Sequence, residues 1–196
     1  MLTRDDSRLS QIHRHSQAVR RSGVAAVEFG VVMLLVMVPT LIGVWEVGRL
    51  IHVQQIVANS AREGARLAAQ ARTINQVGAP TEIVTEIPPA SNTLDQPNVK
   101  AAVIQSLHGA GLTNLSWDDV TVTFAFLDSP SGSIAGATEP FQGVKNQRFA
   151  VTVTIPFNRV RWSTLGLINP TTVSYRAEWR IMVDDPFNIN TSIPSF

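Results

Sequence analysis

Apolar side chains are concentrated in one stretch near the start of the chain. Residues 24–45 form a run of 22 residues in which Glu28 is the one charged side chain. A helix rises about 1.5 Å per residue, so the run has the length of the roughly 30 Å hydrocarbon layer of a bilayer. Pro39 and Gly43 fall inside it, and membrane helices tolerate both. The pattern predicts a transmembrane segment, because a buried core helix of a soluble protein is seldom so long and so uniformly apolar.

Beyond the apolar run the helical pattern continues over residues 46–72, which contain no proline. Apolar residues recur there three and four positions apart, which makes one stripe along a helix. Glu63 and Arg66 are spaced to pair on the wetter side. We expect one long helix, half in lipid and half lying on a folded domain, with the stripe serving packing rather than binding. Small residues would let a neighbouring element approach closely: Ala58, Ser60, Ala61, Gly64, Ala65, Ala68 and Ala69.

Apolar and polar residues alternate in the second half of the chain. The alternation runs over Val120–Phe126, Phe149–Phe157 and Val173–Val183. Such a period of two predicts an antiparallel sheet with one buried face. A helix is expected over residues 98–108, and with the stripe of residues 46–72 it would cover that face. The predicted fold is α+β: a long membrane-spanning helix that continues into a small, pilin-like head with about three to four strands.

The remaining segments read as connections. Residues 73–97 contain four prolines and are predicted to be a linker, with a short segment at Glu82–Ile87 that would pair as an edge strand. Asp128–Gln147 is long for a hairpin loop, which indicates a surface or contact feature or disorder. Arg161–Asn169 is predicted to be a crossover with a short helical turn. Residues 98–183 thus form the exported head, and residues 184–196 a loose tail.

Charge is distributed unevenly around the apolar run. Residues 1–23 carry a net charge of +3 and the remainder −2, although the whole chain carries only +1. The positive-inside rule therefore places residues 1–23 in the cytoplasm and the head on the far side of the membrane. The acidic remainder gives no electrostatic basis for nucleic-acid binding. Cysteine is absent, which excludes disulfides and thiolate sites.

The junction between the basic leader and the apolar run has the form of a processing site. No small-residue cleavage site follows the apolar run closely, so a conventional signal peptide fits poorly. Gly23 ends the leader and Glu28 is the fifth residue after it, a spacing typical of substrates of prepilin peptidases. If Val24 becomes the N-terminus, its amine is a natural partner for Glu28, whose unpaired charge would be costly in hydrocarbon. Alternatively, Glu28 lies in the headgroup layer of an uncleaved anchor.

Three motifs in register carry a family resemblance. They are Ala26-Val27-Glu28-Phe29, then Trp45-Glu46-Val47-Gly48-Arg49, then Asn59-Ser60-Ala61-Arg62-Glu63-Gly64-Ala65-Arg66. Over roughly residues 20–72 the chain resembles the TadE-like family, the minor pilins or pseudopilins of the tight-adherence (Flp, type IVb) pilus. The resemblance implies cleavage after Gly23, residence in the bacterial inner membrane, and partnership with a prepilin peptidase, the major pilin and the platform proteins. It also implies a recognition or assembly role for Glu28 and Phe29. The family motif residues of the third segment are Asn59, Ala61, Arg62, Glu63, Gly64 and Arg66.

Catalytic chemistry has no clear place in this sequence. His52 and His108 have no second ligand at metal-binding spacing, and no nucleophile, phosphate-binding or dinucleotide motif is present. The adjacent acids Asp118-Asp119 and Asp184-Asp185 are interpreted as solvated ends of elements. A basic sheet face formed by Arg159, Arg161, Arg176 and Arg180 is likewise interpreted as a solvated surface. We therefore expect no enzyme, metal, cofactor or small-molecule substrate.

The leading hypothesis is a single-pass minor pilin or pseudopilin that is a prepilin peptidase substrate. The alternative is an uncleaved, membrane-anchored envelope or binding protein with the same anchor. A membrane-anchored enzyme is a third class, for which the sequence offers no active site. Removal of the leader distinguishes the first two.

Overall fold

The computed structural model describes residues 6–74, 80–92, 95–160 and 170–182. The chain divides into two units, Met1–Val47 and Gly48–Phe196, and each is described by itself. The crossover expected at Arg161–Asn169 and the tail expected at residues 184–196 lie outside the described residues. The alternation expected up to Val183 can be followed as far as Met182.

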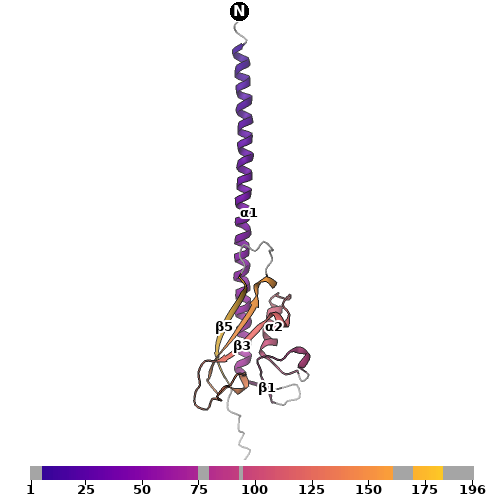
Figure 1. Ribbon diagram of the computed structural model, residues 1–196, viewed down its shortest axis with the longest axis vertical. Coiled ribbons are helices and arrows are strands. Elements are labelled where there is room, and N and C mark those ends of the chain that lie inside the picture. Colours follow the sequence, from indigo (N-terminus) through magenta and orange to yellow (C-terminus); the bar gives the residue numbers. More distant parts are fainter. Residues whose placement is uncertain (1–5, 75–79, 93–94, 161–169, 183–196) are drawn as a thin grey trace, which may run out of the picture. The chain divides into compact units, whose positions relative to one another are not determined.

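The first helix, α1 (Asp6–Gln70), is 65 residues long and passes without interruption through Pro39 (Figure 1). The sequence predicted a helix starting near residue 24, whereas α1 begins in the leader, where residues 6–22 contain neither proline nor glycine. Proline lacks the N–H of a helical hydrogen bond. Beside it, the Thr40 hydroxyl donates to the Val36 carbonyl at 2.8 Å.

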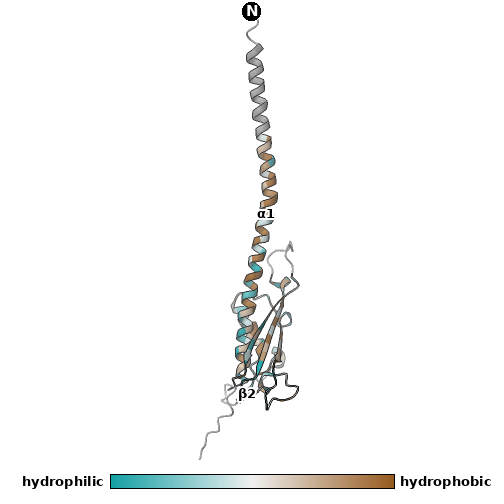
Figure 2. Cartoon of the chain, turned by 90° about the vertical axis from the view of Figure 1, so that its left-hand side faces the viewer, coloured by the Kyte–Doolittle hydropathy of each residue, from teal (hydrophilic) through white to brown (hydrophobic). Residues whose placement is uncertain are grey.

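Within the first unit, the apolar run is exposed along its length. Phe29 and Leu35 keep 66% and 69% of their surface exposed, and Trp45 keeps 67%. Figure 2 shows this part of α1 as largely hydrophobic. Among the described residues, α1 is the one helix long and apolar enough to cross a membrane. The head therefore does not use this run as core.

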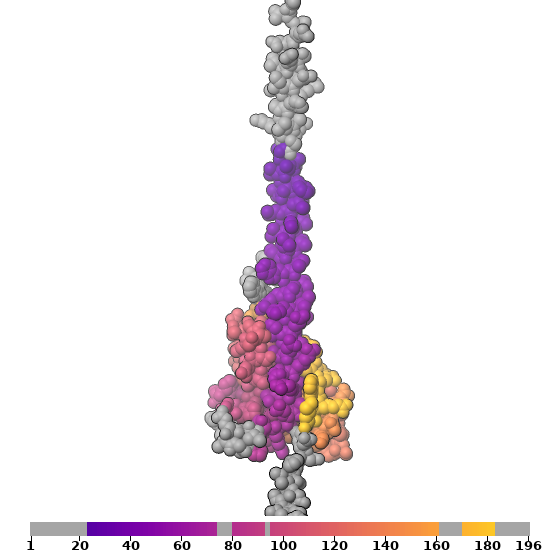
Figure 3. Space-filling view, turned by 180° about the vertical axis from the view of Figure 1, so that it is seen from behind, coloured from indigo at the N-terminus to yellow at the C-terminus, as the bar shows by residue number. Residues whose placement is uncertain are grey.

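The last part of α1 belongs to the second unit and is buried along one stripe. Val53, Val57, Ala61, Ala65 and Ala68 are fully buried, at spacings of four and three residues. This confirms the predicted amphipathic stripe. On the face drawn in Figure 3, this part of α1 lies between α2 (Val99–Gly109) and β5 (Thr172–Arg180).

The helix ends earlier than the sequence predicted, at Gln70 rather than near Arg72. Ala71 follows with a φ of 54°, in the left-handed region that often ends a helix. Arg72–Ile74 then forms β1, which pairs antiparallel with β2 (Pro80–Glu82). The edge strand expected at Glu82–Ile87 is found in part: β2 ends at Glu82, and beyond it Val84 forms an isolated parallel bridge with Asn98. Ile83 is fully buried and donates its N–H to the Ala71 carbonyl.

The second helix, α2, agrees with the prediction. The Asn98 side chain caps its N-terminus by accepting from the Ala101 N–H at 2.8 Å. Val99, Val103 and Leu107 form its buried face. Gly111, with a φ of 94°, follows its end.

The main sheet has three antiparallel strands in the order β3 (Thr121–Phe126), β4 (Arg148–Pro156) and β5. Its register pairs Phe126 with Phe149, and Phe149 with Trp179. In the described part of the chain, four short 3-10 helices lie between these elements: η1 (Pro89–Ser91), η2 (Trp117–Asp119), η3 (Pro140–Gln142) and η4 (Phe157–Arg159). The α+β fold, with a long apolar helix and an antiparallel head, is confirmed.

Candidate functional site

The predicted processing residues lie on an exposed turn of α1 in the first unit. Val24 keeps 59% of its surface exposed, and the position of a Cβ on Gly23 would meet open space. Glu28 is also exposed, and no described residue forms an ion pair with it. Val24 and Glu28 are one turn apart, about 6 Å along the axis. In the intact chain the Val24 nitrogen is part of a peptide bond, so an amine for Glu28 would exist only after cleavage.

The Gly23–Val24 peptide bond lies inside a continuous helix. A peptidase that attacks this bond has to unwind the helix around it. Glycine destabilises a helix interior by roughly 0.5–1 kcal/mol relative to alanine, so Gly23 makes that unwinding easier than its neighbours would.

The predicted motif residues of the second unit surround a close contact between helices. At Gly64, an added Cβ would lie 2.7 Å from Cγ2 of Val103 and 3.1 Å from Cγ1 of Val99, both on α2. Val151 of β4 is the next neighbour, at 3.8 Å. Gly64 therefore lies where α1, α2 and β4 meet. The small-residue stripe serves packing within the head, as predicted.

Arg62 connects α1 to the sheet. Its guanidinium donates to the Asn59 side chain at 3.2 Å and to the Tyr175 hydroxyl at 3.0 Å. The same guanidinium lies 5.4 Å from the centre of the Tyr175 ring, within cation–π range. Two predicted motif residues therefore position β5 against the helix. Their partner Tyr175 was not predictable from the sequence, because Arg62 and Tyr175 lie 113 residues apart.

Glu63 and Arg66 form the predicted ion pair on the exposed side of α1. The shorter of their two contacts joins Nη2 of Arg66 to Oε1 of Glu63 at 2.7 Å. The hydrogen bonds that Arg66 donates to the Glu63 carboxylate, together with the negative charge of that carboxylate, raise the pKa of Arg66 above the ordinary arginine value. Both side chains remain about half exposed or more. The pair is therefore available on the surface and adds little to stability.

Two further polar contacts tie the same part of α1 to the head. Arg49 donates to the Val160 carbonyl at 3.2 Å, and the Ser60 hydroxyl donates to that of Ser106 at 3.1 Å. Arg49 belongs to the second motif of the family resemblance. Its structural role could not be read from the motif, since the acceptor is a backbone group far along the chain.

A polar cluster at the start of α2, formed by Lys100, Glu86 and Trp117, was not predicted from the sequence. Lys100 is almost fully buried, and its ammonium donates to Oε1 of Glu86 at 2.7 Å. The same carboxylate oxygen accepts from the Trp117 indole at 3.2 Å, and Lys100 lies 4.8 Å from the centre of that ring. The one feature of the sequence that could have indicated this cluster is Lys100 itself, a charged residue next to the apolar positions of the helix.

The arginines that were predicted to form one basic face of the sheet do not all lie together. Arg159 pairs with Asp119 at 3.1 Å, and Arg161 lies outside the described residues. Around Glu178, the structure instead places Arg148 at 3.2 Å and Arg176 at 3.3 Å. Asp119 also accepts from the side chain and backbone of Ser116, which, together with Arg159, lowers the pKa of its carboxyl. Asp119 thus caps η2, and Asp184-Asp185 lies outside the described residues.

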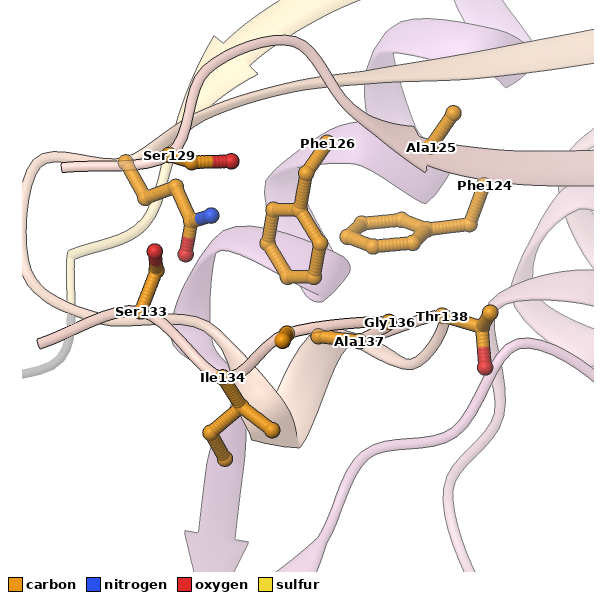
Figure 4. Close-up of a pocket in the computed structure, with 11 residues that line it drawn as sticks. Phe124, Ala125, Phe126, Ser129, Ser133, Ile134, Gly136, Ala137 and Thr138 are labelled. Atoms are coloured by element: carbon orange, nitrogen blue, oxygen red, sulfur yellow. The ribbon is translucent and has the colours of Figure 1, made fainter.

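The loop Asp128–Gln147 contains turns and the η3 helix and is tied to the rest of the head by hydrogen bonds. Its η3 helix is held by Glu139, which accepts from the Thr85 N–H at 2.6 Å, and the Gln147 side chain donates to the Asp128 carbonyl. Between this loop and the end of β3 lies a hollow of about 450 Å³. Figure 4 shows the rings of Phe124 and Phe126 pointing from β3 toward the loop residues Gly136 and Ala137. The 11 residues that line the hollow are all uncharged.

The structure thus places the predicted residues in two groups, one in each unit. Gly23, Val24, Glu28 and Phe29 lie on exposed helix, whereas Gly64, Ala61 and Arg62 pack or bond within the head. In the described part of the chain, no group of three or more His, Asp or Glu residues is arranged to hold a metal ion.

Comparison with known families gives a match to part of the chain. Residues 23–66 match the family described as TadE-like protein, which confirms the resemblance over that range. No curated protein and no solved structure matches the chain. The matched range begins at Gly23 and ends at Arg66, so it includes both groups of predicted residues but not the sheet. Together with the one helix among the described residues that could cross a membrane, the match indicates a single-pass membrane protein.

Proposed function

We propose, starting from the TadE-like match of residues 23–66, that this chain is a membrane-anchored minor pilin or pseudopilin of a tight-adherence (Flp-type) pilus. The observation that carries the proposal is the division of α1. Its apolar run is exposed, while the matched motif that follows is built into a folded head. Such a helix can pack among other helices in a membrane or filament without exposing the core of the head. The proposed role is structural and non-catalytic.

Processing is the first part of this proposal. A prepilin peptidase would cut after Gly23 on the cytoplasmic side, leaving Val24 as the new N-terminus. Glu28 would then pair with the amine of Val24, most simply that of a neighbouring subunit in an assembly. The support is the exposed turn that carries all three residues, together with the cost of an unpaired carboxylate in hydrocarbon.

Intact mass measurement of the membrane-purified protein tests the processing step. We expect 173 residues beginning at Val24 rather than 196 beginning at Met1. The substitution Gly23→Val should trap the precursor, whereas Glu28→Ala should still insert and be cut but fail to assemble. Retention of Met1 in cells with an active prepilin peptidase would refute processing. Normal pilus assembly by the Glu28→Ala variant would refute the pairing role.

The location and partners follow from the same proposal. The protein would reside in the bacterial inner membrane, with residues 1–23 in the cytoplasm and the head outside it. Its partners would be the peptidase, the major pilin and the pilus platform proteins. A reporter enzyme that works only outside the cytoplasm should be active when it is fused after residue 182. A reporter that works only in the cytoplasm should be active when it is fused at residue 1.

A second candidate is favoured by one observation. Because α1 runs without a break from Asp6 through Gly23, the leader and the membrane run form a single helix in the intact chain. This arrangement suits an uncleaved anchor for an envelope or binding protein. The mass measurement separates the two candidates directly.

A further inference from the structure

The three-stranded sheet has two edges that differ sharply in charge. Edge strand β5 carries Arg176, Glu178 and Arg180, and charged side chains are a common protection against unwanted strand pairing. Edge strand β3 has the sequence Thr-Val-Thr-Phe-Ala-Phe, with neither a charge nor a proline. An uncharged edge strand rich in β-branched and aromatic residues is suited to pair with another strand.

The backbone of β3 has groups available for such pairing. The Leu127 N–H donates to the Arg148 carbonyl at 2.8 Å, which shows that Leu127 bonds to β4. Hydrogen-bonded and non-bonded positions alternate along a pair of antiparallel strands. Ala125 therefore also bonds to β4, whereas Phe124 and Phe126 direct their N–H and C=O groups to the outer edge of the sheet. Among the residues that the structure describes, none bonds to these four groups.

The hollow beside this edge supplies a place for a side chain. Side chains directly opposite each other on neighbouring strands point to the same face, with Cβ atoms about 4.5–5.5 Å apart. A residue paired with Phe124 or Phe126 would therefore point, like their rings, toward Gly136 and Ala137 (Figure 4). The hollow of about 450 Å³ falls within the usual size of a ligand pocket.

We propose that the edge of β3 at Phe124–Phe126 accepts an extended, uncharged segment of another protein as a fourth strand, with one apolar side chain of that segment seated in the hollow. Strand addition of this kind takes its affinity from backbone hydrogen bonds and its specificity from pockets for alternate side chains. The uncharged lining selects against a charged segment, because burying an unpaired charge is costly. Loop residues 133–138 line the hollow next to the end of β3, and a single strand needs less room beside this loop than a second folded copy does, which favours the single strand. The inference does not depend on the pilin assignment.

The test uses the full chain in detergent and a short synthetic peptide of alternating threonine and valine, with lysine at both ends for solubility. Binding is measured by fluorescence anisotropy and by amide hydrogen exchange resolved to single residues. We expect the Phe124 and Phe126 amides to exchange more slowly when the peptide is bound, and the already bonded Ala125 amide to change little. A matched peptide with N-methyl groups at the pairing positions keeps the side chains but loses the donors, so it should not bind.

Two protein variants test the contributions of the strand edge and of the hollow to peptide binding separately. Ala125→Lys places a charge on the exposed edge, and Ala137→Leu fills the hollow. Each should weaken peptide binding by about tenfold or more. Ala101→Lys, the same substitution as the first at an exposed position of α2, is the control and should bind like the wild type.

Three results would overturn the proposal: no binding by the wild type at millimolar peptide, equal binding by all variants, or binding without slower exchange at Phe124 and Phe126. Dimerisation of the protein that Ala125→Lys abolishes, with no peptide bound, would show instead that a second copy occupies the edge.

Discussion

The close contact at Gly64 leads to a prediction whose sign depends on two opposing effects. Replacing glycine by alanine in a helix interior normally stabilises a protein by up to about 1 kcal/mol. At Gly64 the new methyl group would lie 2.7 Å from Val103 and 3.1 Å from Val99, inside the range where atoms must move. Valine is stiff at χ1, and both valines are fully buried on α2, so neither can rotate away cheaply.

Overpacking of a dense core costs typically about 1–3 kcal/mol. Set against the gain in helix propensity, Gly64→Ala should therefore lower the free energy of unfolding of the head by about 1 kcal/mol. For a unit of this size, that loss corresponds to a fall in Tm of roughly 2–4 °C. Denaturant unfolding of the purified chain, followed by tryptophan fluorescence, measures it.

Gly48→Ala is the matched control, because Gly48 lies on the same helix and an added Cβ there meets nothing within 4 Å. This control should gain stability or remain unchanged. The double substitution Gly64→Ala with Val103→Ala removes the closest methyl group, so the two changes together should cost less than the sum of the single losses. If Gly64→Ala proves as stable as Gly48→Ala, the reasoning from close packing is wrong.

Other predictions concern the polar contacts of the head. Arg62→Ala and Tyr175→Phe should show a coupling of about 0.5–1 kcal/mol in a double-mutant cycle, since Arg62 donates to the hydroxyl that Tyr175→Phe removes. Additive losses would contradict this hydrogen bond. Glu86→Ala should cost about 1.5–3 kcal/mol in unfolding free energy because it leaves the buried Lys100 ammonium without its ion-pair partner. Lys100→Met keeps the packing and should cost less. A larger loss for Lys100→Met than for Glu86→Ala would contradict the buried ion pair. The lowered pKa of Asp119 predicts stability that is present above its ordinary carboxyl pKa of about 3.9 and lost as the pH falls through the lower folded value; Asp119→Asn should flatten this part of the acid unfolding curve, and an unchanged curve would refute it.

The parts of the fold that repeat a pattern were predictable from the sequence. Alternation over nine residues is sufficient to locate β4, and the spacing of Val53, Val57 and Ala61 is sufficient to orient the second half of α1. The helix expected over residues 98–108 is found as α2, with Asn98 at its start and Gly111 beyond its end, and both residue types are common at helix ends.

The parts that depend on distant partners were not predictable. Strands β1 and β2 have three residues each, too few to show a period, and their pairing depends on where α1 ends. The buried Lys100 is acceptable only because Glu86 and Trp117 meet it from other segments. Gly64 was recognisable as a family motif residue, but its reason is the contact with α2 that the fold creates.

The end of α1 is connected to two segments far away along the chain. The Ala69 carbonyl accepts from the Met182 N–H at 2.8 Å, and the Ala71 carbonyl accepts from the Ile83 N–H at 2.9 Å. These bonds have a mechanical consequence. Tension applied along the second half of α1 would load the segment after β5 and the segment after β2 at the same time, together with the Arg49 and Arg62 contacts. The helix cannot be drawn out of the head without breaking these attachments, so a pulling force on it would be shared among several segments of the head.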